Sequence, residues 1–228
     1  MIMKTVAIIP AYFEEDRIVG AVNDAAAFVD AVVVVDDCSL DRTLERAKST
    51  SAYVLHHFVN CGQGAALQTG MDYALCALQA DVIVHFDADG QMQGKDIPAM
   101  LAPILHQEVD VTLGSRFLGQ VDNIPLTRRL VLKAAIVFTW FTSAIKLSDT
   151  HNGFRALSRR AAEAIRLRQN RMAHASEILD LIASKRLSYR EVPVTIRYTE
   201  ATLNKPTGQK TSALFHIAYD FMNGKMRK

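Results

Sequence analysis

Residues 80–91 read ADVIVHFDADGQ, an apolar run that passes directly into two acidic residues. The segment from Val82 to Phe86 is rich in β-branched residues and predicts a buried strand. Asp87 and Asp89 follow it, and like charges this close destabilise each other unless a cation lies between them. The stretch therefore predicts a strand that ends in a cation site.

Strand-like and helix-like segments alternate through the first half of the chain. The predicted strands are 5–9, 31–35, 52–58, 82–86 and 109–113, and the predicted helices are 18–28, 43–48, 64–78 and 97–105. We expect the first strand to end at Pro10, because proline lacks a backbone N–H. The alternation is typical of an α/β fold with a mostly parallel central sheet flanked by helices on both faces.

In such sheets, ligands bind outside the carboxyl ends of the strands. Three polar clusters follow predicted strands, at residues 12–16, 36–39 and 87–91. Because the carboxyl ends of parallel strands meet at one edge, we expect the three clusters to form one site.

The pattern changes after Gly114. An apolar helix is predicted over 126–145, followed by a loop, SDTHNGFRALS (148–158), two helical segments, a strand (189–194) and a last helix (212–222). No internal repeat or linker is visible, so we predict a single domain over residues 1–228.

The composition excludes several classes of protein. Half of the 228 residues are hydrophobic and 22% are charged, a balance typical of globular proteins. The net charge of +2 is too small to indicate a nucleic-acid partner. Three cysteines without metal-like spacing, and no visible signal peptide, favour a cytoplasmic location. The longest apolar segment, between Lys133 and Lys146, is 12 residues long, whereas a membrane-spanning helix needs about 20.

The residues around the acidic pair indicate which cation fits. An EF-hand starting at Asp87 would need glycine and glutamate where the chain has Met92 and Pro98. Zinc would prefer histidine or cysteine ligands. A few oxygen ligands suit Mg²⁺ or Mn²⁺ that also binds substrate phosphates.

The glycines after the third predicted strand do not form a dinucleotide fingerprint. Gly62, Gly64 and Leu67 give G-x-G-x-x-L, and the chain contains no P-loop motif. The glycines do open a predicted helix, whose N-terminus can face a phosphate. We therefore expect a metal-bound diphosphate at the sheet edge, with Asp36 or Asp37 accepting hydrogen bonds from a base or ribose.

Five segments in this order resemble the family 2 glycosyltransferases of GT-A fold: IIPAYFEE, VVVVDDCSLDRT, NCGQGAALQTG, FDADGQ and LGSRF. The resemblance extends from residue 4 to about 200 and is closest to the branch of polyprenyl-phosphate sugar transferases, such as dolichyl-phosphate mannose synthase. It implies an inverting, metal-dependent transfer from a nucleotide-diphosphate sugar.

The resemblance also divides the domain and implies site residues. Residues 1–114 would bind the donor, 115–200 the acceptor, and 201–228 would form a basic amphipathic segment. The residues that match donor-binding segments are Pro10, Ala11, Tyr12, Glu14, Asp37, Gly64, Asp87 and Ala88. The metal would be held by Asp87, Asp89 and Gln91. An acceptor phosphate would be bound by Arg116, Arg128 and Arg129. The expected catalytic residues are Asp89, Glu177 and Asp149.

Two of the chain's departures from the family pattern lie in the segments that match donor-binding motifs. Phe13 stands where the family usually has asparagine, and Cys38 stands where glycine or asparagine is usual. We expect both substitutions to change the pocket for the nucleotide base.

The acceptor remains open between two chemical classes. A sugar hydroxyl of a surface polysaccharide needs a carboxylate to take its proton, and Glu177 or Asp149 would be that base. A polyprenyl phosphate is already ionised, so phosphate-binding arginines matter more. We favour the phosphate.

Two further classes of protein fit the sequence less well. An inactive nucleotide-sugar-binding subunit would have degraded metal ligands, whereas Asp87 and Asp89 are present. A sugar-phosphate nucleotidyltransferase would need a glycine-rich basic loop where residues 12–16 are acidic.

The segment 205–228 has five basic residues and one acidic residue, which favours peripheral contact with an anionic membrane. Formation of a homo-oligomer is compatible with the sequence.

Overall fold

The computed structural model describes residues 3–118, 121–122, 147–149, 152–170 and 173–197. The helices are α1 (Ile18–Ala26), α2 (Thr43–Lys48), α3 (Gln63–Cys76), α4 (Ile97–Leu105), α6 (Arg159–Ala164) and α7 (His174–Ser184), with a 3₁₀ turn, η1 (Gly94–Asp96). The strands are β1 (Thr5–Ala11), β2 (Ala31–Asp36), β3 (Tyr53–His56), β4 (Val82–His85), β5 (Val111–Ser115), β6 (Val121–Asp122), β7 (Arg155–Ser158), β8 (Tyr189–Pro193) and β9 (Ile196–Arg197). Both α2 and α4 have the predicted bounds, and the other elements whose bounds were predicted within the described residues differ at their ends by one or two residues.

The central sheet has seven strands in the order β3-β2-β1-β4-β7-β5-β8. Every neighbouring pair is parallel except the two pairs that include β7, which runs antiparallel to β4 and to β5. A separate two-stranded sheet pairs β6 with β9. The predicted fold class, a mostly parallel α/β sheet, is confirmed.

The strand β7 corrects one prediction, because residues 155–158 were expected to lie in a loop. The strand is short and begins with Arg155, a charged residue that local propensity does not favour in a buried strand. Its place comes from pairing on both sides: Arg155 lies opposite His85 of β4 and opposite Leu113 of β5. The segment is therefore a strand because it pairs with β4 on one side and with β5 on the other.

Pro10 does not end β1, contrary to the prediction, and lies opposite Val35 within it. Thr5 and Ala11 accept hydrogen bonds on the β2 side, whereas Ile8 accepts one on the β4 side. Because the backbone polar groups of successive residues face opposite neighbouring strands, the nitrogen of Pro10 faces β4. The pairing of β1 with β4 ends before Pro10, at Ile8 with His85. The missing N–H costs no sheet hydrogen bond there.

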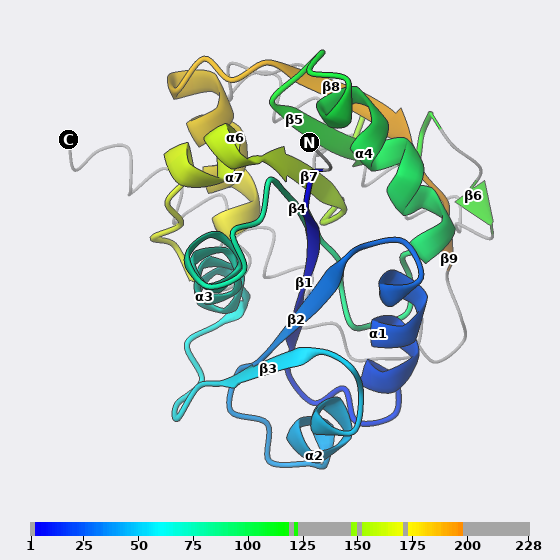
Figure 1. Ribbon diagram of the computed structural model, residues 1–228, viewed down its shortest axis with the longest axis vertical. Coiled ribbons are helices and arrows are strands. Elements are labelled where there is room, and N and C mark those ends of the chain that lie inside the picture. Colours follow the sequence, from blue (N-terminus) through cyan, green and yellow to red (C-terminus); the bar gives the residue numbers. More distant parts are fainter. Residues whose placement is uncertain (1–2, 119–120, 123–146, 150–151, 171–172, 198–228) are drawn as a thin grey trace, which may run out of the picture. The chain divides into compact units, whose positions relative to one another are not determined.

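Helices cover both faces of the sheet (Figure 1). One face packs against α3, α6 and α7 through a core that includes Ile8, Val35 and Met71. On the other side lie α1 and α4, whose buried residues include Ile18 and Met100. Burial on both sides explains why β1 and β2 are apolar throughout.

Several predictions fall outside the described residues. These are the apolar helix at 126–145 with Arg128 and Arg129, and the basic segment 201–228 with its helix at 212–222. Residues 1–197 form one compact unit, in which strands from both predicted halves share one sheet. Within the described part of the chain, no helix has the length and apolar character needed to cross a bilayer.

Candidate active site

The loops that follow β1 and β2 are joined at the carboxyl edge of the sheet. The backbone N–H of Asp37 donates to the carbonyl of Ala11 at 2.9 Å, and the N–H of Phe13 donates to Oγ of Ser39 at 3.0 Å. Since β4 pairs with β1 on the other side, the acidic turn after β4 opens on the same edge. The structure thus brings together the three polar clusters.

Two residues from distant segments lie against the carboxylate of Asp87, and a third residue contacts its backbone. Nε2 of Gln63, the first residue of α3, donates to Oδ1 at 3.0 Å. Gly153 packs so closely that a Cβ atom added to it would lie 2.7 Å from Oδ2. The backbone N–H of Asp87 faces Sδ of Met92 at 3.2 Å. The carboxylate is therefore held in one place by residues from distant parts of the chain.

The charges near Asp87 are unbalanced. Burial raises the pKa of the Asp87 carboxyl to about 7, and repulsion from Asp89 and Glu14 adds to this. Arg155 and the hydrogen bond from Gln63 act in the opposite direction without cancelling the shift. A divalent cation among these carboxylates would favour their ionised forms.

The turn after β4 supplies only oxygen donors of the kind that Mg²⁺ and Mn²⁺ bind. Oδ1 of Asp89 accepts the backbone N–H of Gln91 at 3.0 Å, and Gly90 between them has φ +75°, in the left-handed region. The carbonyl of Gln91 accepts the N–H of Arg197 of β9 at 2.9 Å. The carboxylates of Asp87 and Asp89 and the amide of Gln91 thus belong to one short turn, whose chemistry fits a hard divalent cation.

Arg155, the first residue of β7, lies close enough to Asp87 to affect its pKa. It was not among the predicted site residues. It is 2% exposed, and Nε has no hydrogen-bond partner among the residues that the structure describes. Burial lowers the pKa of Arg155 to about 10, although Asp87 and Asp149 act to raise it. A buried positive charge close to two carboxylates is a structural feature that no local motif marks.

His85 lies beside Arg155 in the sheet and is equally buried. Neither ring nitrogen has a hydrogen-bond partner among the described residues. Burial, then the charges of Arg155 and His174, lower the pKa of His85 to about 3. The imidazole is therefore neutral at physiological pH.

The predicted donor-binding residues differ in what they present. Tyr12 is 47% exposed, and its ring meets that of Phe13 edge to face at 4.5 Å. Glu14 is buried and pairs with Arg17 at 2.6 Å. The remaining small or apolar ones, Pro10, Ala11, Gly64 and Ala88, are all buried. Gly64 has a packing role, because a Cβ atom there would lie 2.2 Å from the carbonyl oxygen of Gln169.

The two aspartates at the carboxyl end of β2 bind the last residue of β3 and the loop that follows it. Oδ2 of Asp36 lies 2.8 Å from Nδ1 of His56. Oδ1 of Asp37 lies 2.8 Å from Nδ1 of His57, and its two oxygens also accept the N–H groups of Cys61 and Gly62 at 2.8 and 2.6 Å. Asp37, expected to contact the nucleotide, therefore also shapes the loop at 57–62.

Arg116 and Asp149, which the sequence assigned to acceptor binding and to base catalysis, bind each other. Nε of Arg116 donates to Oδ2 of Asp149 at 2.6 Å, and Nη2 donates to Oδ1 at 3.2 Å. The side chains are only 9% and 1% exposed. The Asp149 carboxylate is thus enclosed and bound by the Arg116 guanidinium, which does not suit a proton acceptor for an incoming hydroxyl.

Glu177, the other predicted base, also has partners in the structure. Its carboxylate accepts the backbone N–H groups of Arg168 and Gln169 at 2.9 to 3.0 Å. The side chain therefore fixes the loop before α7.

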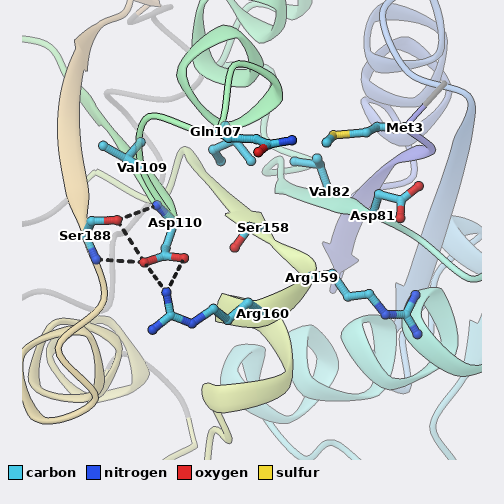
Figure 2. A pocket seen from close by; sticks show the side chains of 11 residues that line it. Met3, Asp81, Val82, Gln107, Val109, Asp110, Ser158, Arg159, Arg160 and Ser188 are labelled. Carbon is cyan, nitrogen blue, oxygen red and sulfur yellow. Dashed lines mark hydrogen bonds and ion pairs between the residues drawn. The ribbon is translucent and has the colours of Figure 1, made fainter. Parts of the chain in front are cut away.

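A cavity of about 370 Å³ lies at the other end of the sheet (Figure 2). Its lining includes Asp81 and Val82 at the start of β4, and Asp110 and Ser188 just before β5 and β8. The carboxylate of Asp110 is bound by Arg160 and Ser188. These are the amino ends of the parallel strands, so the cavity is separate from the acidic turn.

The sequence matches the family model described as Glycosyl transferase family 2 over residues 6–166. It is 30% identical to the UDP-N-acetylglucosamine–dolichyl-phosphate N-acetylglucosaminyltransferase of Methanococcus voltae, over 97% of this chain and 96% of that one. It is 29% identical to the undecaprenyl-phosphate mannosyltransferase of Micrococcus luteus, over 89% of this chain and 86% of that one.

The fold is also shared with solved structures. Glucosyl-3-phosphoglycerate synthase from Mycobacterium tuberculosis, crystallised with Mn²⁺ and UDP-glucose, superposes with a TM-score of 0.66 at 20% identity. The match covers 91% of this chain and 73% of the synthase. This likeness shows the GT-A fold.

Proposed function

Because this chain belongs to the family 2 glycosyltransferases, we propose that it transfers a sugar from a nucleotide-diphosphate sugar to a polyprenyl phosphate, with inversion at the sugar carbon. The observation that carries the proposal is the Asp87 carboxylate, which Gln63 and Gly153 hold in place near Asp89 and Glu14 at the carboxyl edge of the sheet. Such an excess of negative charge suits a site that binds a cation together with a diphosphate.

Asp87, Asp89 and Gln91 would hold Mg²⁺ or Mn²⁺. When bound, the ion would act as a Lewis acid that stabilises the negative charge on the departing diphosphate. The synthase with the same fold was crystallised with Mn²⁺ and UDP-glucose, which supports a divalent ion and a nucleotide-sugar donor.

The arrangement of carboxylates supports a phosphate acceptor. A sugar hydroxyl would need a base, but Asp149 is paired with Arg116 and Glu177 is bound to backbone N–H groups. A phosphate oxygen is already ionised and needs no base. The relatives from Methanococcus voltae and Micrococcus luteus carry polyprenyl phosphates in their names.

The proposed transfer is a single displacement. An oxygen of the acceptor phosphate forms a bond to the anomeric carbon while the bond from that carbon to the diphosphate oxygen breaks. The electron pair of the broken bond leaves with the nucleoside diphosphate. Attack opposite the leaving group inverts the configuration, and no proton is transferred.

The acceptor's lipid tail places this reaction at a membrane surface. We propose that the enzyme works on the cytoplasmic face, with the basic segment 205–228 in contact with anionic lipid. Vesicle flotation with and without anionic lipid tests this contact, and equal recovery from both would contradict it.

The experiment that tests the function pairs two acceptors that differ only in the phosphate. The full chain is incubated with a panel of nucleotide sugars and either a short polyprenyl phosphate or the matching polyprenol, with Mn²⁺ or with a chelator. We expect a glycolipid from the phosphate alone, formed only with metal, and none from Asp87→Asn. The anomeric configuration of the product then tests inversion.

Other outcomes would contradict parts of the proposal. Transfer to a glycan but not to polyprenyl phosphate would show a hydroxyl acceptor. Binding of a donor without turnover under any condition would show an inactive binding subunit.

A further inference from the structure

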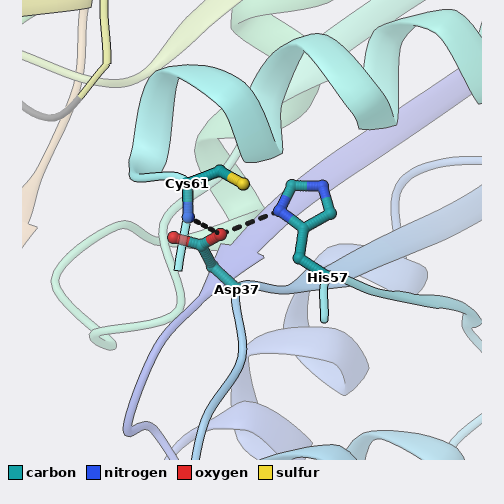
Figure 3. Close-up of side chains that lie close together, drawn as sticks. All are labelled: Asp37, His57 and Cys61. Atoms are coloured by element: carbon teal, nitrogen blue, oxygen red, sulfur yellow. Dashed lines mark hydrogen bonds and ion pairs between the residues drawn. The ribbon is translucent and has the colours of Figure 1, made fainter. Parts of the chain in front are cut away.

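Asp37, His57 and Cys61, which we call the Asp37 cluster, meet beside the start of α3 (Figure 3). Each residue offers one potential ligand atom, namely a carboxylate oxygen of Asp37, Nδ1 of His57 and Sγ of Cys61. The three atoms all lie within 4.8 Å of one another. Figure 3 shows the imidazole of His57 and the thiol of Cys61 on the same side of the carboxylate.

The cluster is prepared for ligation in two respects. Nε2 of His57 lies 3.0 Å from Oγ1 of Thr69, and this contact orients Nδ1 toward Asp37. Hydrogen bonds to the second nitrogen of a ligating histidine are typical of metal sites. The carboxylate is fixed by the N–H groups of Cys61 and Gly62, and these contacts leave lone pairs for a further bond.

We propose that the Asp37 cluster binds a borderline transition-metal ion such as Zn²⁺. Zinc is typically bound by nitrogen, thiolate sulfur and carboxylate oxygen atoms, and a site with three such ligands leaves a fourth position for water. Tetrahedral zinc with bond lengths of about 2.0–2.3 Å separates such ligand atoms by roughly 3.3–3.5 Å. The cluster reaches this geometry by side-chain movements of about 1 Å.

The proton balance of binding is defined. Zinc displaces the proton of the Cys61 thiol, which leaves to solvent, and the single proton of the neutral His57 ring moves from Nδ1 to Nε2, which frees the Nδ1 lone pair for the metal. The imidazole then carries its proton on Nε2 and donates it to Oγ1 of Thr69. Binding therefore weakens as the pH falls, because protons compete for sulfur and nitrogen.

This site differs in chemistry from the acidic turn at Asp87. The turn offers only oxygen atoms, which suit Mg²⁺ or Mn²⁺, whereas the Asp37 cluster offers sulfur and nitrogen. The two sites therefore prefer different ions. If Asp37 also contacts the donor, as the proposed function implies, zinc at the cluster antagonises donor binding.

The test uses the chain's own cysteines as internal controls. The full chain carrying Asp87→Asn and Asp89→Asn, which removes the other cation site, is alkylated with iodoacetamide in the presence or absence of Zn²⁺. The rate at each cysteine is followed by mass spectrometry. We expect zinc to slow alkylation of Cys61 on the order of tenfold, while the half-buried Cys38 and the exposed Cys76 are unaffected.

Variants identify the ligands. His57→Gln should abolish the protection of Cys61. Cys61→Ser should abolish the thiolate-to-metal absorption that Co²⁺ produces in the parent protein, whereas Cys76→Ser should leave it unchanged. Equal protection of the three cysteines, or protection that survives His57→Gln, would overturn the proposal.

A second measurement separates this inference from the proposed function. Nucleotide-sugar binding to the otherwise unsubstituted chain is titrated with and without zinc, in excess Mn²⁺. Weaker donor binding with zinc that Cys61→Ser relieves supports the antagonism. If no nucleotide sugar binds at all, the proposed function fails while the alkylation result still decides the zinc site.

Discussion

A Cβ atom on Gly153 would lie 2.7 Å from Oδ2 of Asp87. This contact links the start of the only antiparallel strand in the described central sheet to the acidic turn after β4. The absence of a side chain at residue 153 is therefore part of how Asp87 is positioned.

Gly153→Ala should strongly lower metal-dependent turnover with little loss of stability. The methyl group would push the Asp87 carboxylate away from its position, and the φ angle at residue 153 does not require glycine. We expect turnover to fall by about 10²-fold or more, since a carboxylate displaced by about 1 Å binds the ion poorly. The measurement is donor turnover together with thermal unfolding.

Gly20→Ala is the matched control, because nothing lies within 4 Å of a Cβ atom there. Gly20 is inside α1, so alanine should raise the free energy of unfolding by about 1 kcal/mol and leave turnover unchanged. Equal turnover in the two variants would contradict the role assigned to Gly153.

Asp87→Asn should lower turnover while stabilising the metal-free protein above neutral pH. The substitution removes a charge that burial and Asp89 destabilise. We expect a rise in the melting temperature near pH 8 with chelator present, and a loss of turnover of about 10²-fold or more. A lower melting temperature would show that the carboxylate charge stabilises the fold.

The affinity for Mn²⁺ should fall below neutral pH. The raised pKa of Asp87, about 7, means that the metal-free fold binds a proton more tightly than the unfolded chain. Its contribution to stability is therefore present at low pH and lost as the pH rises from about 4 to about 7. Protons and Mn²⁺ compete for the same carboxylate, so affinity should fall about tenfold per pH unit below 7. Binding measured between about pH 5 and pH 8 tests this, and a flat profile would contradict it.

Arg116→Ala should destabilise the protein more than a surface substitution would. It removes the cation that donates hydrogen bonds to the carboxylate of Asp149, whose side chain is 1% exposed. Removing one partner of a buried ion pair costs about 3–5 kcal/mol. Denaturant unfolding measures the loss, and Arg160→Ala serves as the control because the side chain of Arg160 is 71% exposed. If Arg116→Ala lowered the free energy of unfolding as little as Arg160→Ala does, the Arg116–Asp149 pair would contribute little.

Phe13→Asn and Cys38→Gly should each stabilise the protein. Phe13 has φ +56° and Cys38 has φ +65°, in the left-handed region that asparagine and glycine adopt at lower cost. We expect a gain of about 1 kcal/mol for each in thermal or denaturant unfolding. Cys76→Gly, at the end of α3, should instead destabilise it. A loss of stability at Cys38→Gly would show that the thiol contributes more than the backbone strain costs.

At both of these left-handed positions the sequence was expected to depart from the residues usual in the family. Both lie in loops at the carboxyl edge of the sheet. Unfavourable backbone conformations persist where the surrounding structure holds them, and they are frequent at functional sites. The sequence comparison predicted a changed base pocket, and the structure adds that each change has an energetic cost.

The local sequence was sufficient to predict the parallel part of the fold. Strands such as β1 and β2 are apolar throughout because both faces are covered, and that pattern is visible in a few consecutive residues. The acidic turn was predictable for the same reason, since Asp87 and Asp89 directly follow their strand. The order of the motifs placed the chain in its family.

Only the tertiary structure decided which distant side chains meet. Gln63 and Asp87 are 24 positions apart, and Arg116 and Asp149 are 33 apart. Their contacts depend on strand order and helix packing, which no local pattern encodes. The strand β7, with the buried Arg155, exists because β4 and β5 pair with it on both sides. The sequence alone therefore determined the helices, the strands and the acidic turn. Long-range packing decided the partners of each charged group. A buried charge is stable only where the fold brings a counter-charge or a hydrogen bond to it.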